Sequence, residues 1–74
     1  MVTEKQIEEI QRNAIGIAEG FEDEPEGVDH TEALRVAWQY LIDTGVCWRL
    51  QGWFGRTAQS LIDQGFVLPY PRKR

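Results

Sequence analysis

Two similar hexapeptides, LIDTGV at residues 41–46 and LIDQGF at residues 61–66, form a weak repeat in the C-terminal half of this 74-residue chain. Each contains an apolar pair, a polar step, a glycine and a further apolar residue, which is the pattern of a helix that ends at a glycine cap. Gly45 and Gly65 therefore predict the ends of two helices, over about residues 30–44 and 46–64. One repeat of six residues is too short to indicate a repeat architecture.

The N-terminal part of the chain predicts one further helix, over about residues 4–19. Thr3 and Gln6 have the spacing of a capping box at its start, and Gly20 provides the C-cap at its end. Asp29, with Glu32 three residues later, is the expected N-cap of the helix over residues 30–44. The apolar stripe of the first helix consists of Ile7, Ile10, Ala14, Ile17 and Phe21.

We expect the fold class to be all-α, a small three-helix bundle with helices at about 4–19, 30–44 and 46–64. Residues 1–66 would form a single helical domain, because a chain of this length supports only one core. Pro69 and Pro71 flank Tyr70, so residues 67–74 are expected to form an extended, basic C-terminal tail.

The composition argues against several classes of protein. Cys47 is the only cysteine, so no disulfide can form within the chain, and Cys47 and the single His30 cannot supply a four-ligand zinc site. No apolar run approaches the ~18 residues of a membrane span, and the N-terminus lacks a signal-peptide pattern. We therefore expect a cytoplasmic protein with no cofactor, no metal and no membrane partner.

No arrangement of residues in the sequence indicates catalysis. His30 lies next to Asp29 at a predicted helix start, Ser60 has no recognisable base near it in sequence, and Cys47 is expected to be buried. The sequence contains no glycine-rich phosphate loop and no paired-carboxylate motif. We therefore expect that the protein is not an enzyme and that it acts by binding.

Charge is distributed unevenly along the chain. The net charge of −4 combines −8 over residues 1–33 with +4 over residues 34–74. Four side chains around Pro25 form what we call the acidic loop: Glu22, Asp23, Glu24 and Glu26. As a calcium-binding loop this segment would have Ala33 where the bidentate glutamate belongs. We therefore expect a solvated loop whose charge suits a basic patch on a partner.

The predicted helix over residues 46–64 carries an unusual set of residues opposite its apolar stripe. We call this set the tryptophan face: Trp48, Gly52, Gly55, Arg56 and Gln59. Each glycine inside a helix costs about 1 kcal/mol relative to alanine, so either something packs closely on this surface or the helix breaks near Gly52. In the first case the face is a partner-binding site, because Trp and Arg dominate interface hot spots. In the second case the helix is kinked and all three tryptophans lie in the core.

The same segment interleaves aromatic and basic residues, a combination that also occurs in nucleic-acid-binding proteins. A helix-turn-helix motif is not supported, because Leu41 and Gln51 stand where a small and an aliphatic residue are expected. The negative net charge also disfavours nucleic acid. The basic residues that would contact phosphates are Arg49, Arg56, Arg72, Lys73 and Arg74.

Residues 36–66 resemble a small family of uncharacterised tailed-bacteriophage proteins. The resemblance rests on LIDTG at residues 41–45, WxLQG at 48–52, GRxA at 55–58 and LIxxG at 61–65. It implies a phage or prophage origin and implies no particular activity. Small acidic phage proteins often act by binding a host protein, which favours the binding hypothesis by analogy.

The leading hypothesis is a phage-type accessory protein that binds and modulates a host or phage protein in the host cytoplasm. The acidic loop would steer the encounter, and the tryptophan face would supply the contact area. The alternatives are a nucleic-acid-binding protein that uses the third helix and the tail, and a structural homodimer in which the tryptophan face pairs with itself.

Overall fold

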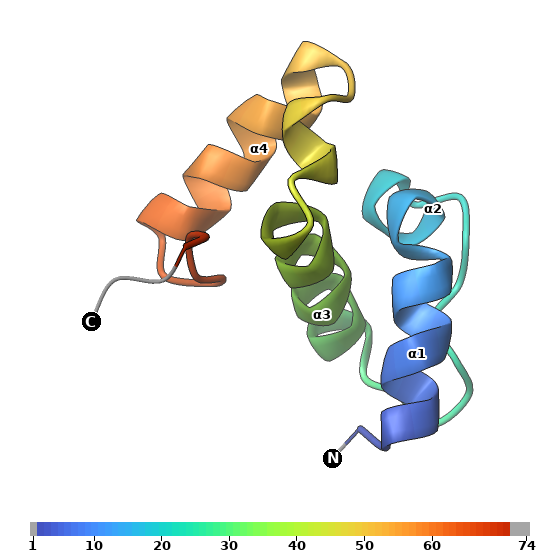
Figure 1. The fold of residues 1–74 in the computed structure, drawn as a ribbon. Coiled ribbons are helices and arrows are strands. Elements are labelled where there is room, and N and C mark those ends of the chain that lie inside the picture. The colour runs from blue at the N-terminus through green and yellow to red at the C-terminus, as the bar shows by residue number, and fades with distance from the viewer. Residues whose placement is uncertain (1, 72–74) are drawn as a thin grey trace.

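The computed structural model describes residues 2–71, and within this range the protein is helical, with no strand. The elements are α1 (Glu4–Arg12), α2 (Ala14–Glu19), α3 (His30–Asp43), a 3₁₀ turn η1 (Val46–Trp48) and α4 (Gly52–Asp63). α3 lies in the middle of the molecule: α1 and α2 pack on one side of it, and η1 and α4 lie on the other (Figure 1). The expected small all-α bundle is confirmed.

The helix ends follow the capping residues in the sequence. The Thr3 hydroxyl accepts the Gln6 backbone N–H at 3.1 Å, and the Gln6 side chain accepts the Thr3 N–H at 2.9 Å, so the capping box forms. The Asp29 carboxylate accepts the Glu32 N–H at the start of α3. Gly45 and Gly65 both take the left-handed conformation, with φ of 78° and 79°, which only glycine adopts without steric cost.

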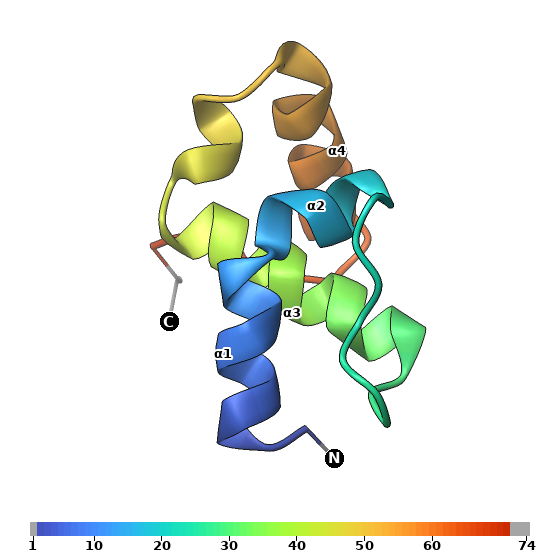
Figure 2. The same ribbon diagram turned by 90° about the vertical axis from the view of Figure 1, so that its right-hand side faces the viewer.

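The helix expected over residues 4–19 is interrupted at Asn13. This residue has φ −109° and ψ 21°, outside the helical range, and the chain changes direction there (Figure 2). Asparagine is a poor helix former, because its side chain competes for the backbone hydrogen bonds. The bend lets α2 lie against α3 while Ile10, Ala14 and Ile17 all stay buried in the core.

The prediction of one continuous helix over residues 46–64 is wrong. η1 ends at Trp48, Gln51 is extended with ψ 153°, and α4 begins at Gly52. Gly52 favours this break, because glycine has a low helix propensity and would destabilise a continuous helix. Breaking the rod lets η1 bury Cys47 and lets α4 direct Phe54 and Ala58 to the core.

An aromatic cluster joins α3 to α4. The ring of Trp38, on α3, is 5.9 Å from the ring of Phe54 and 6.3 Å from that of Trp53, measured between centroids. Trp38 is buried and Trp53 half-buried, whereas Trp48 is 49% exposed. The expectation that a kink would place all three tryptophans in the core is therefore wrong, because η1 turns Trp48 outward.

Phe21 does not belong to the apolar stripe that was expected for the first helix. α2 ends at Gly20, and the Phe21 N–H then donates to the Gly16 carbonyl at 2.9 Å, which closes the turn. The chain leaves the helix axis at this point. As a result the Phe21 side chain is 84% exposed.

The core extends into the segment that was expected to be tail. Val67 is buried, and the Gln39 side chain forms two hydrogen bonds of 2.9 Å with the backbone of Leu68, one as donor and one as acceptor. These bonds attach the end of the chain to α3. Arg72, Lys73 and Arg74 lie outside the described residues.

Replacing Gln39 with alanine should detach this segment. Both backbone groups of Leu68 lose their partner, so we expect the free energy of unfolding to fall by about 1–2 kcal/mol. Amide exchange at Leu68 should accelerate more than exchange in α3. Gln64→Ala is the matched control, because Gln64 is exposed and donates only to Ser60. Equal effects of the two substitutions would contradict the role of Gln39.

Candidate functional site

The tryptophan face is assembled by a contact between η1 and α4. A Cβ atom on Gly55 would lie 3.4 Å from Cε3 and 3.6 Å from Cζ3 of Trp48, so the benzene ring of the indole rests on this glycine. The sequence offered one explanation for the two glycines, namely that another group packs closely against them. For Gly55 the partner is Trp48 of the same chain.

The other members of the face follow along α4. A Cβ on Gly52 would lie 3.0 Å from Nη1 of Arg56, so the guanidinium folds over this glycine. Gln59 comes one helical turn after Arg56 and donates to Asp63 at 3.0 Å. All the predicted residues of the face therefore come together, although not on an unbroken helix.

The face combines an apolar ring with uncompensated positive charge. Trp48, Arg49 and Arg56 are all exposed. Within residues 2–71 the ion pairs are His30–Glu24 and Arg35–Glu32, so neither Arg56 of the face nor the adjacent Arg49 forms an ion pair there. Such a surface can contact an apolar group and a carboxylate or phosphate at the same time.

The acidic loop has a fixed course. His30 Nδ1 lies 2.9 Å from Glu24 Oε1, Gln6 Nε2 donates to the Glu26 carbonyl at 3.3 Å, and Pro25 is buried. The hydrogen bond to Glu24 raises the pKa of His30, and the same bond to His30 lowers the pKa of Glu24. The side chains of Glu22, Asp23 and Glu26 remain exposed on this anchored loop.

The tryptophan face and the acidic loop are separate surfaces. The acidic loop descends along the side of α1 and α2, whereas α4 lies on the other side of α3 (Figures 1 and 2). The sequence prediction grouped both in one partner-binding set. The structure does not bring them together, so one small partner segment cannot cover both.

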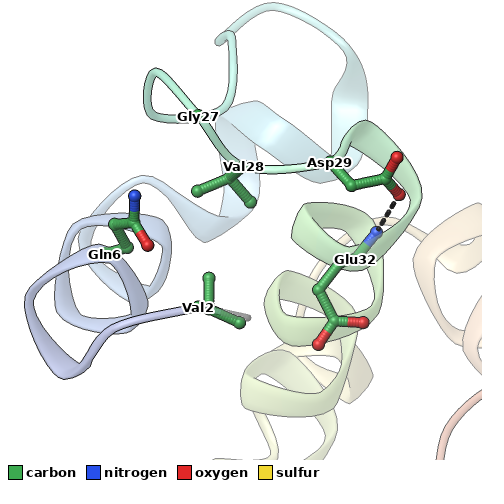
Figure 3. Close-up of a pocket in the computed structure, with 6 residues that line it drawn as sticks. All are labelled: Val2, Gln6, Gly27, Val28, Asp29 and Glu32. Atoms are coloured by element: carbon green, nitrogen blue, oxygen red, sulfur yellow. Dashed lines mark hydrogen bonds between the residues drawn. The ribbon is translucent and has the colours of Figure 1, made fainter.

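A pocket that was not expected from the sequence lies between the start of α1 and the start of α3 (Figure 3). It has a volume of about 230 Å³ and is lined by Val2, Gln6, Gly27, Val28, Asp29 and Glu32. Small-molecule sites usually measure ~300–1,000 Å³. The polar groups of the pocket already have local partners: Asp29 caps α3, and Glu32 binds Arg35, which lowers the pKa of Glu32. The residues that line the pocket come from the N-terminal segment and from the segment at the start of α3, and no sequence pattern predicts that these two segments lie together.

The described residues supply little for metal or thiol chemistry. No group of three His, Cys, Asp or Glu side chains within residues 2–71 is placed to hold a metal ion. Cys47 is buried, and this desolvation raises the pKa of its thiol and disfavours the reactive thiolate. In the same range, no helix has the length and apolar character needed to cross a membrane.

The fold and the two surfaces define a small helical domain that presents an exposed aromatic and basic face. Residues 17–71 match the family model described as Domain of unknown function (DUF7417), and the chain belongs to this family. The match begins at Ile17, so the acidic loop and the tryptophan face both fall inside the family domain. No curated protein and no solved structure gives a significant match.

Proposed function

We propose that the protein is a small accessory protein that binds another protein through the tryptophan face. The observation that carries this proposal is the half-exposed indole of Trp48, held against Gly55 beside the exposed guanidinium of Arg56. Tryptophan and arginine are enriched among interface hot spots. An indole that is already ordered before binding also loses less conformational entropy on association.

We propose further that the partner is a host or phage protein, and that the protein modulates its partner in the host cytoplasm. The LIDTG, WxLQG, GRxA and LIxxG pattern, which resembles tailed-bacteriophage proteins, supports the phage origin. The negative charge of the N-terminal half supports a steering role for the acidic loop, since an acidic surface accelerates encounters with basic ones.

Truncation of either anchor should abolish binding without unfolding the protein. We expect Trp48→Ala and Arg56→Ala to keep a helical circular dichroism spectrum, because both side chains are exposed. Loss of a hot-spot side chain costs about 2 kcal/mol or more, which weakens binding roughly 30-fold or more. The measurement is affinity capture from host lysate, with identification of the captured protein and titration against its purified form.

Tyr70→Ala and Arg12→Ala are the matched controls, because they remove an exposed aromatic and an exposed arginine that are not among the residues of the face. The controls should capture the same protein as the unmodified chain. If all four variants bind equally, the tryptophan face is not the site.

Nucleic-acid binding is a second candidate, favoured by the exposure of Trp48, Arg49 and Arg56. An arginine can contact phosphate while the indole stacks on a base. Such binding would weaken steeply as the salt concentration rises. A gel shift with single- and double-stranded oligonucleotides at low ionic strength tests it, and an unshifted probe would remove this candidate.

A further inference from the structure

Phe21 is the most exposed large apolar side chain in the described chain, at 84%. Its backbone is fixed, because the N–H groups of Phe21 and Glu22 both donate to the Gly16 carbonyl, at 2.9 and 3.1 Å. Burial of a phenylalanine side chain is worth about 1.5–3 kcal/mol, and here the fold gains almost none of it. This ring is therefore available as an anchor for an intermolecular contact.

The surroundings of Phe21 define the surface that would receive it. Glu22 and Asp23 follow directly and are exposed. A complementary surface has an apolar patch with positive charge at its edges. The tryptophan face has this combination, because the half-exposed Trp48 rests on Gly55, next in the chain to the exposed Arg56, and the exposed Arg49 directly follows Trp48.

The two surfaces cannot meet within one molecule, since the acidic loop and α4 lie on different sides of α3 (Figure 1). They can meet between copies. A two-fold contact that paired the tryptophan face with itself would place arginines opposite arginines. A head-to-tail contact instead places the arginines opposite the carboxylates of Glu22 and Asp23.

We propose that the acidic loop of one copy, with Phe21 as its anchor, docks on the tryptophan face of a second copy, head to tail. This inference rests on the proposed binding role of the face and adds a second copy of the chain as an occupant of the same face. In such a pair one copy keeps a free face and the other keeps a free loop, so the contact generates chains or closed rings. The opposite net charges of the two halves, −8 and +4, favour the same orientation.

Sedimentation of the full chain at low salt gives the first measurement. The average mass should rise above the monomer value of 8.6 kDa as the concentration increases, without a plateau at the dimer unless a ring closes. Association should weaken at least tenfold near 1 M NaCl, because the screening length falls from ~10 Å at 0.1 M to ~3 Å. Phe21→Ser should weaken it similarly and leave the unfolding midpoint unchanged.

Charge reversal tests the orientation. The variant Arg49→Glu with Arg56→Glu and the variant Glu22→Lys with Asp23→Lys should each be monomeric. Their mixture should associate, because the first supplies an unaltered acidic loop and the second an unaltered tryptophan face. Glu8→Lys with Glu9→Lys and Lys5→Glu with Arg12→Glu are the matched controls, which change the same charges at exposed positions on α1. The controls should self-associate like the unmodified chain.

Three results would overturn the proposal: a monomer at every concentration, association that persists in both reversed variants, or equal loss in the controls. If the chain is monomeric but Trp48→Ala no longer captures a lysate protein that the unmodified chain captures, this inference is wrong and the proposed function stands. If the chain is monomeric and Trp48→Ala also leaves capture unchanged, the proposed function fails with it.

Discussion

Trp38→Ala is expected to remove a large part of the stability of this protein. Trp38 is 4% exposed, and its ring contacts Trp53 and Phe54, which makes it the main aromatic link between α3 and α4. Truncation of a buried tryptophan costs about 3–5 kcal/mol. A chain of this length has about 4–11 kcal/mol in total, at 0.05–0.15 kcal/mol per residue. The substitution should therefore remove a large share of the total stability, and the urea midpoint should fall accordingly.

Urea unfolding followed by far-ultraviolet circular dichroism measures this loss. Trp48→Ala is the control, because it removes the same type of side chain from a position that is half exposed. We expect the control to cost about 1–2 kcal/mol, from the smaller apolar area it uncovers. Similar losses for both variants would mean that Trp38 does not link the helices in the way its ring contacts indicate.

The helix ends could be predicted because capping is local. The Thr3 hydroxyl meets an N–H three residues away, the Asp29 carboxylate does the same, and Gly45 needs only its own φ to end α3. Each of these features is decided by neighbours in the sequence. The starts of the first two predicted helices and the positions of the glycine caps could therefore be predicted correctly without knowledge of tertiary contacts.

The breaks in the helices could not be predicted from periodicity. A helical stripe and two separate segments that face the same core give nearly the same apolar spacing. For this reason residues 4–19 suggested one helix, although Asn13 divides them, and residues 46–64 suggested one helix, although Gln51 is extended. The two bonds of Gln39 to Leu68 join residues 29 apart, and no local pattern announces such a contact.

The residues of the tryptophan face come together as the sequence suggested, but they do so across a helix break and apart from the acidic loop. Two glycines near a tryptophan indicated close packing, and Trp48 does pack on Gly55. Composition alone does not say whether the packing group belongs to the same chain or to a partner. The sequence also placed Phe21 on the apolar stripe of the first helix, because a stripe position directly after a C-cap cannot be distinguished by spacing from one inside the helix.

The repeated hexapeptides offer the most direct test of how far sequence alone determines energetics. Leu41 and Leu61 hold the same place in LIDTGV and LIDQGF, and the following glycines have nearly equal φ. Their surroundings differ: Leu41 is 1% exposed on α3, which is packed on both sides, whereas Leu61 is only half-buried on α4. Similar local sequence therefore does not give similar burial.

Leu41→Ala should cost about 2–5 kcal/mol, the range for a leucine that leaves a cavity in a closed core. Leu61→Ala should cost less than half as much, because the exposed side of α4 lets water replace the lost methyl groups. Urea midpoints of the two variants give the comparison, provided that the slopes of the unfolding curves agree. Equal losses would show that α4 is as enclosed as α3, and the repeat would then describe two equivalent halves of one core.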